Sequence, residues 1–171
     1  MNQEITVFGK TFVPFIDRHK IQQRISEIAA QINQDYEGEE PLLIGILNGS
    51  FIFAADLFRG LTINASISFV KLASYKGTTS TGNVVTAIGL DENLQGRHVI
   101  IVEDIIDTGK TLHTFLPQLL NQQPASLKVA VLLDKPEPRK FEVPIHYSCF
   151  VIPNKFVLGY GLDYDGLGRN I

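Results

Sequence analysis

The chain has 171 residues, of which 44% are hydrophobic and 19% are charged, a size and composition typical of one globular domain. We therefore expect residues 1–171 to form a single domain. The net charge of −3 argues against a nucleic-acid-binding protein, because phosphates favour clustered Lys and Arg. The single cysteine, Cys149, cannot form an intrachain disulfide, and the sequence shows neither a signal peptide nor an apolar run of the ~20 residues that cross a membrane. These features predict a soluble cytoplasmic protein.

Helix and strand patterns alternate in the first half of the chain. Isoleucines recur at helical spacing between Asp17 and Asp35, which predicts an amphipathic helix with an Asp cap. The apolar run PLLIGIL at residues 41–47 predicts a buried strand, and FIFAADLFRG at 51–60 predicts a helix that ends at Gly60. Two more strands are predicted, joined by the loop ASYKGTTSTGN, whose Gly, Ser and Thr content cannot supply a core; they span residues 67–72 and 84–90.

The second half repeats the alternation and then changes character. RHVIIVED at 97–104 and LKVAVLLDK at 127–135 predict buried strands, and TLHTFLPQLL at 111–120 predicts a helix that accommodates Pro117. Residues 141–171 are typical of short strands and turns, which we expect to form a lid or a base pocket. Continuous apolar strands separated by helices imply an α/β fold with a parallel sheet covered by helices on both faces. Ligands of such sheets bind beyond the carboxyl ends of the strands.

The most informative segment is VIIVEDIIDTGKTL at residues 99–112, where a buried strand leads through a polar loop into a helix. Gly109 permits a tight backbone turn. The N–H groups of the loop and of the helix start form a nest for a phosphate, to which the hydroxyls of Thr108 and Thr111 contribute. The loop therefore predicts an anion site made from backbone geometry.

Two adjacent acids, Glu103 and Asp104, stand at the end of the same strand. They would repel a phosphate that they faced, so we expect them to bind vicinal ribose hydroxyls, directly or with a magnesium ion. A Walker A loop needs Gly where Asp104 stands, which argues against an ATPase. An ordinary strand-to-helix turn would explain Asp107 and Thr108 as capping residues but leaves the two acids unexplained.

This segment resembles the phosphoribosyl pyrophosphate (PRPP) motif of type I phosphoribosyltransferases, in which an acidic pair contacts the ribose hydroxyls and the following loop holds the 5-phosphate. Three further segments resemble hypoxanthine-guanine phosphoribosyltransferases: LNGSFIFAADLF at 47–58, VLLDK at 131–135 and PNKFVLGYGLDYDGLGR at 153–169. The resemblance implies the type I fold with a flexible lid loop and a small hood made from terminal segments. It also implies magnesium-dependent purine salvage, in which the phosphoribosyl group of PRPP moves to hypoxanthine or guanine, and a homodimer or homotetramer.

Carried over by position, the resemblance gives a PRPP-binding set of Glu103, Asp104, Asp107, Thr108, Gly109, Lys110 and Thr111. Within this set it implies that Glu103 and Asp104 bind magnesium. A carboxylate near N7 of the base can take up or relay its proton, and Asp107 is our candidate for that role.

For the purine, the resemblance implies that Lys135 donates to the 6-oxo group, Phe156 stacks on the ring and the Val157 backbone meets the base edge. A cation at that oxygen selects 6-oxopurines, because the amino group of adenine would be a donor facing a donor. Taken singly, Lys135 is better explained as a solvated turn lysine and Phe156 as a core aromatic, but their joint placement favours the base-binding roles.

For the pyrophosphate, the resemblance implies a turn at Asn48 and Gly49 entered through a non-proline cis peptide, in which backbone amides face the ligand. Many relatives carry Lys or Arg at the position of Asn48, so a charge contact is absent from this chain. Arg169 is implied to reach the pyrophosphate, and Asp163 to border the purine site and hold a second magnesium. A plain glycine turn, an exposed terminal Arg and a turn-forming Asp are the simpler alternatives.

Ser74 and Tyr75 resemble the start of the loop that closes over the site, with a surface linker as the alternative. Closure would keep water from hydrolysing a ribosyl cation.

Three other functions stay open at this point. They are transfer to another base such as xanthine or adenine, non-enzymatic sensing of PRPP, and a purely structural role.

Overall fold

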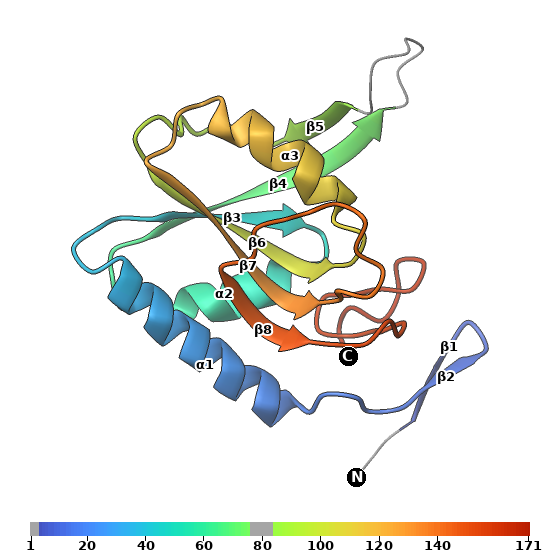
Figure 1. Ribbon diagram of the computed structural model, residues 1–171. Helices are drawn as coiled ribbons and strands as arrows, with labels where there is room; N and C mark the ends of the chain where they lie inside the picture. The colour runs from blue at the N-terminus through green and yellow to red at the C-terminus, as the bar shows by residue number, and fades with distance from the viewer. Residues whose placement is uncertain (1–3, 76–83) are drawn as a thin grey trace.

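A six-stranded sheet forms the centre of the molecule in the computed structural model, which describes residues 4–75 and 84–171 (Figure 1). The strands lie in the order β5-β4-β3-β6-β7-β8. Their bounds are β3 (Leu42–Leu47), β4 (Ser66–Tyr75), β5 (Val84–Ile88), β6 (His98–Ile106), β7 (Ser126–Asp134) and β8 (Tyr147–Val151). Every pairing is parallel except that of β4 with β5.

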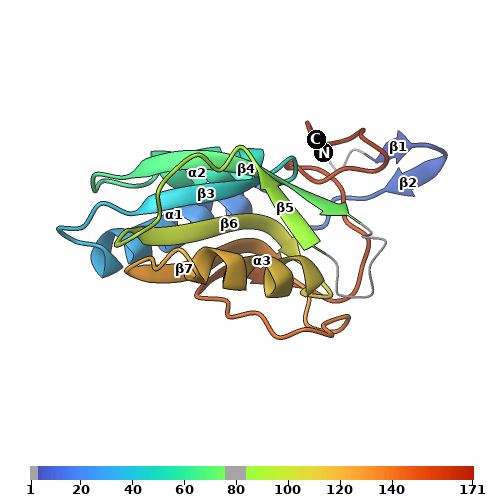
Figure 2. The same cartoon turned by 90° about the horizontal axis from the view of Figure 1, so that it is seen from above.

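Helices cover both faces of the sheet, which confirms the predicted layers. The helices α1 (Arg18–Asp35) and α2 (Phe51–Arg59) pack on one face, and α3 (Lys110–Leu120) packs on the other (Figure 2). Alternate strand residues serve the two layers, since Leu43 joins the core beneath α1 and α2 while its neighbour Ile44 joins the core beneath α3. Both faces of the strands are therefore apolar, as the continuous hydrophobic runs predicted.

The helix α1 shows how the sequence fixes an element and its orientation. Asp17 caps it by accepting a hydrogen bond from the Lys20 N–H at 2.9 Å. Ile25, Ile28 and Ile32 are each at most 3% exposed, and burying one such side chain contributes roughly 1.5–3 kcal/mol. The apolar stripe therefore decides which face of the helix meets the sheet.

The chain order creates a switch point between β3 and β6. From β3 the chain passes through α2 to β4 on one side, and from β6 it passes through α3 to β7 on the other side. The position outside the carboxyl ends of β3 and β6, at such a switch point, is the usual ligand position in these sheets. Both the Asn48–Gly49 turn and the acids of β6 lie at this edge.

Two strands differ from the prediction. The strand β4 continues to Tyr75, so that residues 73–75, which were assigned to the loop, pair with β5. The strand β5 ends at Ile88 and runs antiparallel at the sheet edge. The physical reason is the short connection over 76–83, because a parallel crossover needs a dozen or more residues. The predicted lid loop itself falls outside the described residues.

An N-terminal hairpin, which was not predicted, joins the C-terminal segment. It consists of β1 (Ile5–Val7) and β2 (Lys10–Phe12), connected by Phe8 and Gly9, both at positive φ. The rings of Phe8 and Phe12 lie 5.5 and 6.5 Å from the Tyr164 ring. The hairpin and residues 153–171 thus form the hood expected from terminal segments. Across residues 4–75 and 84–171, no helix has the length and apolar character needed to traverse a lipid bilayer.

Candidate active site

Three chain segments meet at the switch point with almost no space between them. The peptide between Leu47 and Asn48 is cis. A Cβ added to the next residue, Gly49, would overlap the carboxylate of Asp104. Gly161 of the hood, with φ +101°, packs so closely that a Cβ there would overlap the carbonyl oxygen of Gly49. The end of β3, the end of β6 and the hood are therefore in direct contact, and glycine is required at two of the three positions.

The polar loop after β6 enters α3 as the sequence indicated. Gly109 is the N-cap of α3 in the left-handed region, at φ 80°. The Thr108 N–H donates to the Asp107 carboxylate at 2.6 Å, and the Lys110 N–H donates to the Thr108 hydroxyl at 3.4 Å. A cavity of about 210 Å³ opens here and is lined by Glu103, Asp104, Ile105, Ile106, Asp107, Gly109, Thr111 and Leu112. Five of the seven predicted PRPP residues therefore face one cavity, while Thr108 and Lys110 belong to the loop beside it.

The two acids form a close, poorly solvated pair. Glu103 is 8% exposed and accepts a hydrogen bond from the Asp104 N–H at 3.2 Å. Burial raises the pKa of Glu103 well above its usual value, and the neighbouring Asp104 carboxylate raises this pKa further. A bound cation reverses this effect by favouring the ionised form. A cation bound beside Glu103 would therefore lower the cost of ionising this buried carboxyl group.

The donor set at this edge suits magnesium. Mg²⁺ prefers oxygen ligands and is usually held by one or two carboxylates together with substrate phosphates. Within the part of the chain that the structure describes, no group of three His, Cys, Asp or Glu side chains is arranged to hold a metal ion. The acids Glu103 and Asp104 therefore fit an ion that takes its remaining ligands from a bound diphosphate.

The structure brings Lys135 and Phe156 together at the base of the hood. Lys135 is 9% exposed, and its ammonium donates to the Lys155 carbonyl oxygen at 2.9 Å. Phe156, the residue after Lys155, is 62% exposed, and its ring lies 5.4 Å from the Tyr164 ring in an edge-to-face arrangement. Lys135 is too buried to be a solvated turn lysine, and Phe156 is too exposed to be a core aromatic. Both simpler alternatives therefore disagree with the structure. Val157 is half-buried beside them.

Asp163 and Arg169 pair with each other inside the hood. Arg169 Nη2 lies 2.7 Å from Asp163 Oδ1, while Nη1 donates to the Gly161 carbonyl oxygen at 2.6 Å. The second Asp163 oxygen accepts from the Gly166 N–H at 2.7 Å. Arg169 is therefore not a free terminal side chain, because its guanidinium already has two partners inside the hood.

Comparison with known proteins identifies the family. The phosphoribosyl transferase domain family matches residues 16–165. The chain belongs to the phosphoribosyltransferase family. A hypoxanthine-guanine phosphoribosyltransferase of Streptococcus pneumoniae is 41% identical over 157 residues, which cover 91% of this chain and 87% of that protein. A hypoxanthine-guanine-xanthine phosphoribosyltransferase of Tritrichomonas foetus is 43% identical over 152 residues, covering 88% and 83%.

A solved structure gives the same result for the fold. The hypoxanthine-guanine phosphoribosyltransferase of Bacillus anthracis, crystallised with a HEPES molecule in its active site, superposes with a TM-score of 0.85. The two chains are 42% identical, and the match covers 92% of this chain and 93% of that one. The predicted family, fold class and transferase activity are thereby confirmed.

The start of the predicted lid lies on the sheet of this phosphoribosyltransferase. The backbone of Ser74 pairs with Val85 and that of Tyr75 with Val84, at the end of β4. The predicted role of the two residues in closing the site stays a prediction.

Sequence reasoning missed two polar contacts that support the site of this phosphoribosyltransferase. Arg139, whose side chain is 19% exposed, donates to the Asp107 carbonyl oxygen at 2.8 Å and pairs with Asp134. The Tyr160 hydroxyl donates to Asp56 Oδ2 at 2.5 Å and so ties the hood to α2. The sequence carries no signal for either contact. A lone Arg among Pro, Glu and Lys is typical of a solvated loop, and Tyr160 and Asp56 lie far apart in the chain.

A second, larger hollow of about 950 Å³ lies between the N-terminal and C-terminal segments of the phosphoribosyltransferase. Its lining includes Phe12, Phe15, Phe156 and Val157, but no residue of the 103–112 segment. The smaller cavity is therefore the one that coincides with the predicted phosphate chemistry.

Proposed function

We propose that this phosphoribosyltransferase moves the 5-phosphoribosyl group of PRPP to hypoxanthine or guanine, giving IMP or GMP and pyrophosphate in purine salvage. The observation that carries the proposal is the contact of three segments at one end of the sheet. The cis-peptide turn after β3, the acid pair of β6 and Gly161 of the hood meet there, while buried Lys135 follows β7 and exposed Phe156 lies on the hood. The names of the relatives from S. pneumoniae and T. foetus support the same substrate class.

In this proposal the sugar phosphate is held by backbone and carboxylate groups acting on different parts of the molecule. The amides of the loop and of the α3 start bind the 5-phosphate, helped by the hydroxyls of Thr108 and Thr111. Glu103 and Asp104 accept hydrogen bonds from the ribose diol. The turn at Asn48 and Gly49 offers its amides to the pyrophosphate, without the cationic side chain that many relatives carry there.

Glu103 and Asp104 also hold Mg²⁺ in this proposal, and Asp163 holds a second ion once it separates from Arg169. The ion would neutralise charge on the pyrophosphate as the bond to the anomeric carbon breaks. The released Arg169 guanidinium is then available to the same anion.

The base is recognised and activated by groups on two sides. Lys135 exchanges the Lys155 carbonyl for the purine 6-oxo group, where it also stabilises the negative charge that gathers as the ring loses its proton. Phe156 stacks on the ring, and the backbone of Val157 meets the base edge. Asp107, which stands exposed on the loop, takes up or relays the proton from N7.

Two alternative bases differ in what supports them. The T. foetus relative includes xanthine in its name, so xanthine is the second candidate for this chain. Adenine is disfavoured by the donor at Lys135.

The test is pyrophosphate release with PRPP, Mg²⁺ and each of hypoxanthine, guanine, xanthine and adenine. We expect turnover with one or both of the first two. Absence of nucleotide formation with every base, from protein that binds PRPP in calorimetry, would instead indicate a PRPP sensor.

Assembly and location belong to the same proposal. We place the enzyme in the cytoplasm as a homodimer or homotetramer. Light scattering of the purified protein gives its mass in solution and decides between a monomer and these assemblies.

A further inference from the structure

A layer of contacts lies behind the phosphate-binding loop, in the segment that follows β7. The Arg139 guanidinium donates from Nε to the Asp107 carbonyl oxygen at 2.8 Å and from Nη2 to the Ile106 carbonyl oxygen at 3.0 Å. The same Nη2 pairs with Asp134 Oδ1 at 2.5 Å. One side chain therefore bonds to the carbonyl of the last β6 residue, the carbonyl of the first loop residue and a carboxylate.

The backbone of the same segment holds the next loop carbonyl. The Thr108 carbonyl oxygen accepts from the N–H groups of Lys140 and Phe141, each at 3.0 Å. The Ile106 oxygen accepts a second bond, from the Lys135 N–H at 2.9 Å. Three consecutive carbonyls, those of residues 106, 107 and 108, are thus all engaged from one side.

This arrangement fixes the direction of the amides that follow these carbonyls. In a trans peptide the C=O of one residue and the N–H of the next point in opposite directions. The N–H groups of Asp107, Thr108 and Gly109 are therefore turned away from Arg139. The Thr108 N–H already meets an anionic oxygen on that side, the carboxylate of Asp107.

We propose that Arg139 is a positioning residue for the 5-phosphate, which acts by holding the loop carbonyls so that the loop amides face the ligand. It touches the loop backbone and not the substrate. The proposal rests on the proposed function, because it assigns the loop to the phosphate of PRPP and of the product nucleotide.

Burial and packing support a fixed geometry. The side chains of Arg139 and Asp134 are 19% and 17% exposed, so their ion pair is shielded from solvent. A Cβ built on Gly109 would lie 2.9 Å from Arg139 Cδ, so the stem of the arginine packs close to the loop at this glycine. A lysine offers a single ammonium group and cannot bond to three separated oxygens in a planar fork.

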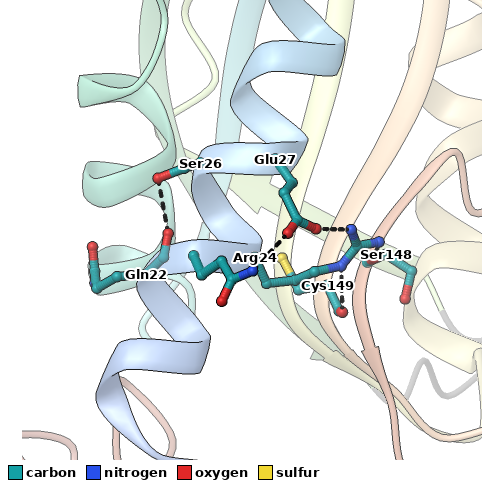
Figure 3. A network of polar contacts seen from close by, with 7 residues as sticks. Gln22, Arg24, Ser26, Glu27, Ser148 and Cys149 are labelled. Carbon is teal, nitrogen blue, oxygen red and sulfur yellow. Dashed lines mark hydrogen bonds and ion pairs between the residues drawn. The ribbon is translucent and has the colours of Figure 1, made fainter.

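Another arginine in the same chain provides a matched control. Arg24 of α1 also bonds two consecutive backbone carbonyls and one carboxylate, namely those of Ser148, Cys149 and Glu27 (Figure 3). Its targets lie on β8 and on α1 itself, away from the phosphate-binding loop. Substitution at Arg24 therefore removes an equivalent set of contacts without touching the site.

The experiment measures steady-state kinetics in both directions for Arg139→Ala, Arg139→Lys, Arg24→Ala and Arg24→Lys. For Arg139→Ala we expect KM for PRPP and for IMP to rise roughly tenfold, which corresponds to about 1.4 kcal/mol. KM for pyrophosphate, which binds at the other turn, should stay within about twofold of wild type. Arg139→Lys should raise the same two KM values by a smaller factor, roughly threefold or more. Both Arg24 variants should keep all these constants.

The outcomes separate positioning from general destabilisation. An unchanged KM for PRPP in the folded Arg139 variants overturns the proposal, as does an equal change in the Arg24 variants. If Arg139→Ala does not fold, Arg139→Lys decides by the same criterion. Calorimetric affinity for IMP provides a readout that does not need turnover. Wild-type protein that binds IMP but shows no transferase activity would refute the proposed function and would leave the positioning role of Arg139 intact.

Discussion

Replacing Lys135 by Ala removes a buried ammonium group that is 9% exposed and donates to the Lys155 carbonyl oxygen of the hood. A hydrogen bond to a charged group is worth roughly 1.5–3 kcal/mol, and loss of a donor to a developing oxyanion lowers turnover by roughly 10²–10³-fold. We therefore expect kcat/KM for hypoxanthine to fall by roughly 10²-fold. KM for PRPP should change by less than about threefold, since Lys135 lies outside the phosphate cavity.

The assay is the spectrophotometric formation of IMP at saturating PRPP and at varied hypoxanthine, repeated at varied PRPP. Lys20→Ala serves as the control, because the Lys20 side chain is 71% exposed on α1. Discrimination against adenine should also weaken in the Lys135 variant, since the donor that opposes the 6-amino group is gone. Parallel losses of hypoxanthine and PRPP affinity would refute the assignment of Lys135 to the base.

The remaining predictions concern the loop, the turn and acid stability. Asp107→Asn should lower turnover far more than PRPP affinity, measured by calorimetry beside kinetics; equal losses would contradict a proton-transfer role. Gly49→Ala should abolish activity, because the added Cβ overlaps the Asp104 carboxylate, and normal pyrophosphorolysis would disprove this. The hydrogen bond from Tyr147 lowers the pKa of Asp35, so the stability it contributes is present above its unfolded pKa of about 3.9 and is lost as the pH falls through its lower folded value. The free energy of unfolding, measured with urea, should therefore decrease below about pH 4, and it should decrease less steeply with falling pH in Asp35→Asn. Identical pH dependences of the two proteins would refute the linkage.

The layered core and the strand-turn-helix unit from β6 to α3 could be predicted because each depends on local patterns. The isoleucines of α1 repeat at helical spacing behind an Asp cap, and the structure buries that stripe. The segment from Glu103 to Thr111 combines a strand end, a glycine turn and a helix start in contiguous sequence. Where one short stretch contains the whole physical cause, sequence reasoning reached the correct element.

Features that depend on contacts between distant segments were missed. The direction of β5 follows from the length of its connection and its pairing with β4, and apolar content alone does not reveal it. The hairpin of β1 and β2 is stabilised by rings of the C-terminal segment. Arg139 bonds to carbonyls about thirty residues earlier in the chain, and Arg169 pairs with Asp163 only because the hood folds back on itself.

The contacts of Arg24 have a consequence for the exposed margin of the sheet. Edge strands display unpaired backbone groups that can recruit a strand from another molecule and begin aggregation. At β8 the carbonyl oxygens of Ser148 and Cys149 are already occupied by a guanidinium from α1. A foreign strand would have to displace a charged fork to pair there, so this margin is a poor template for sheet extension.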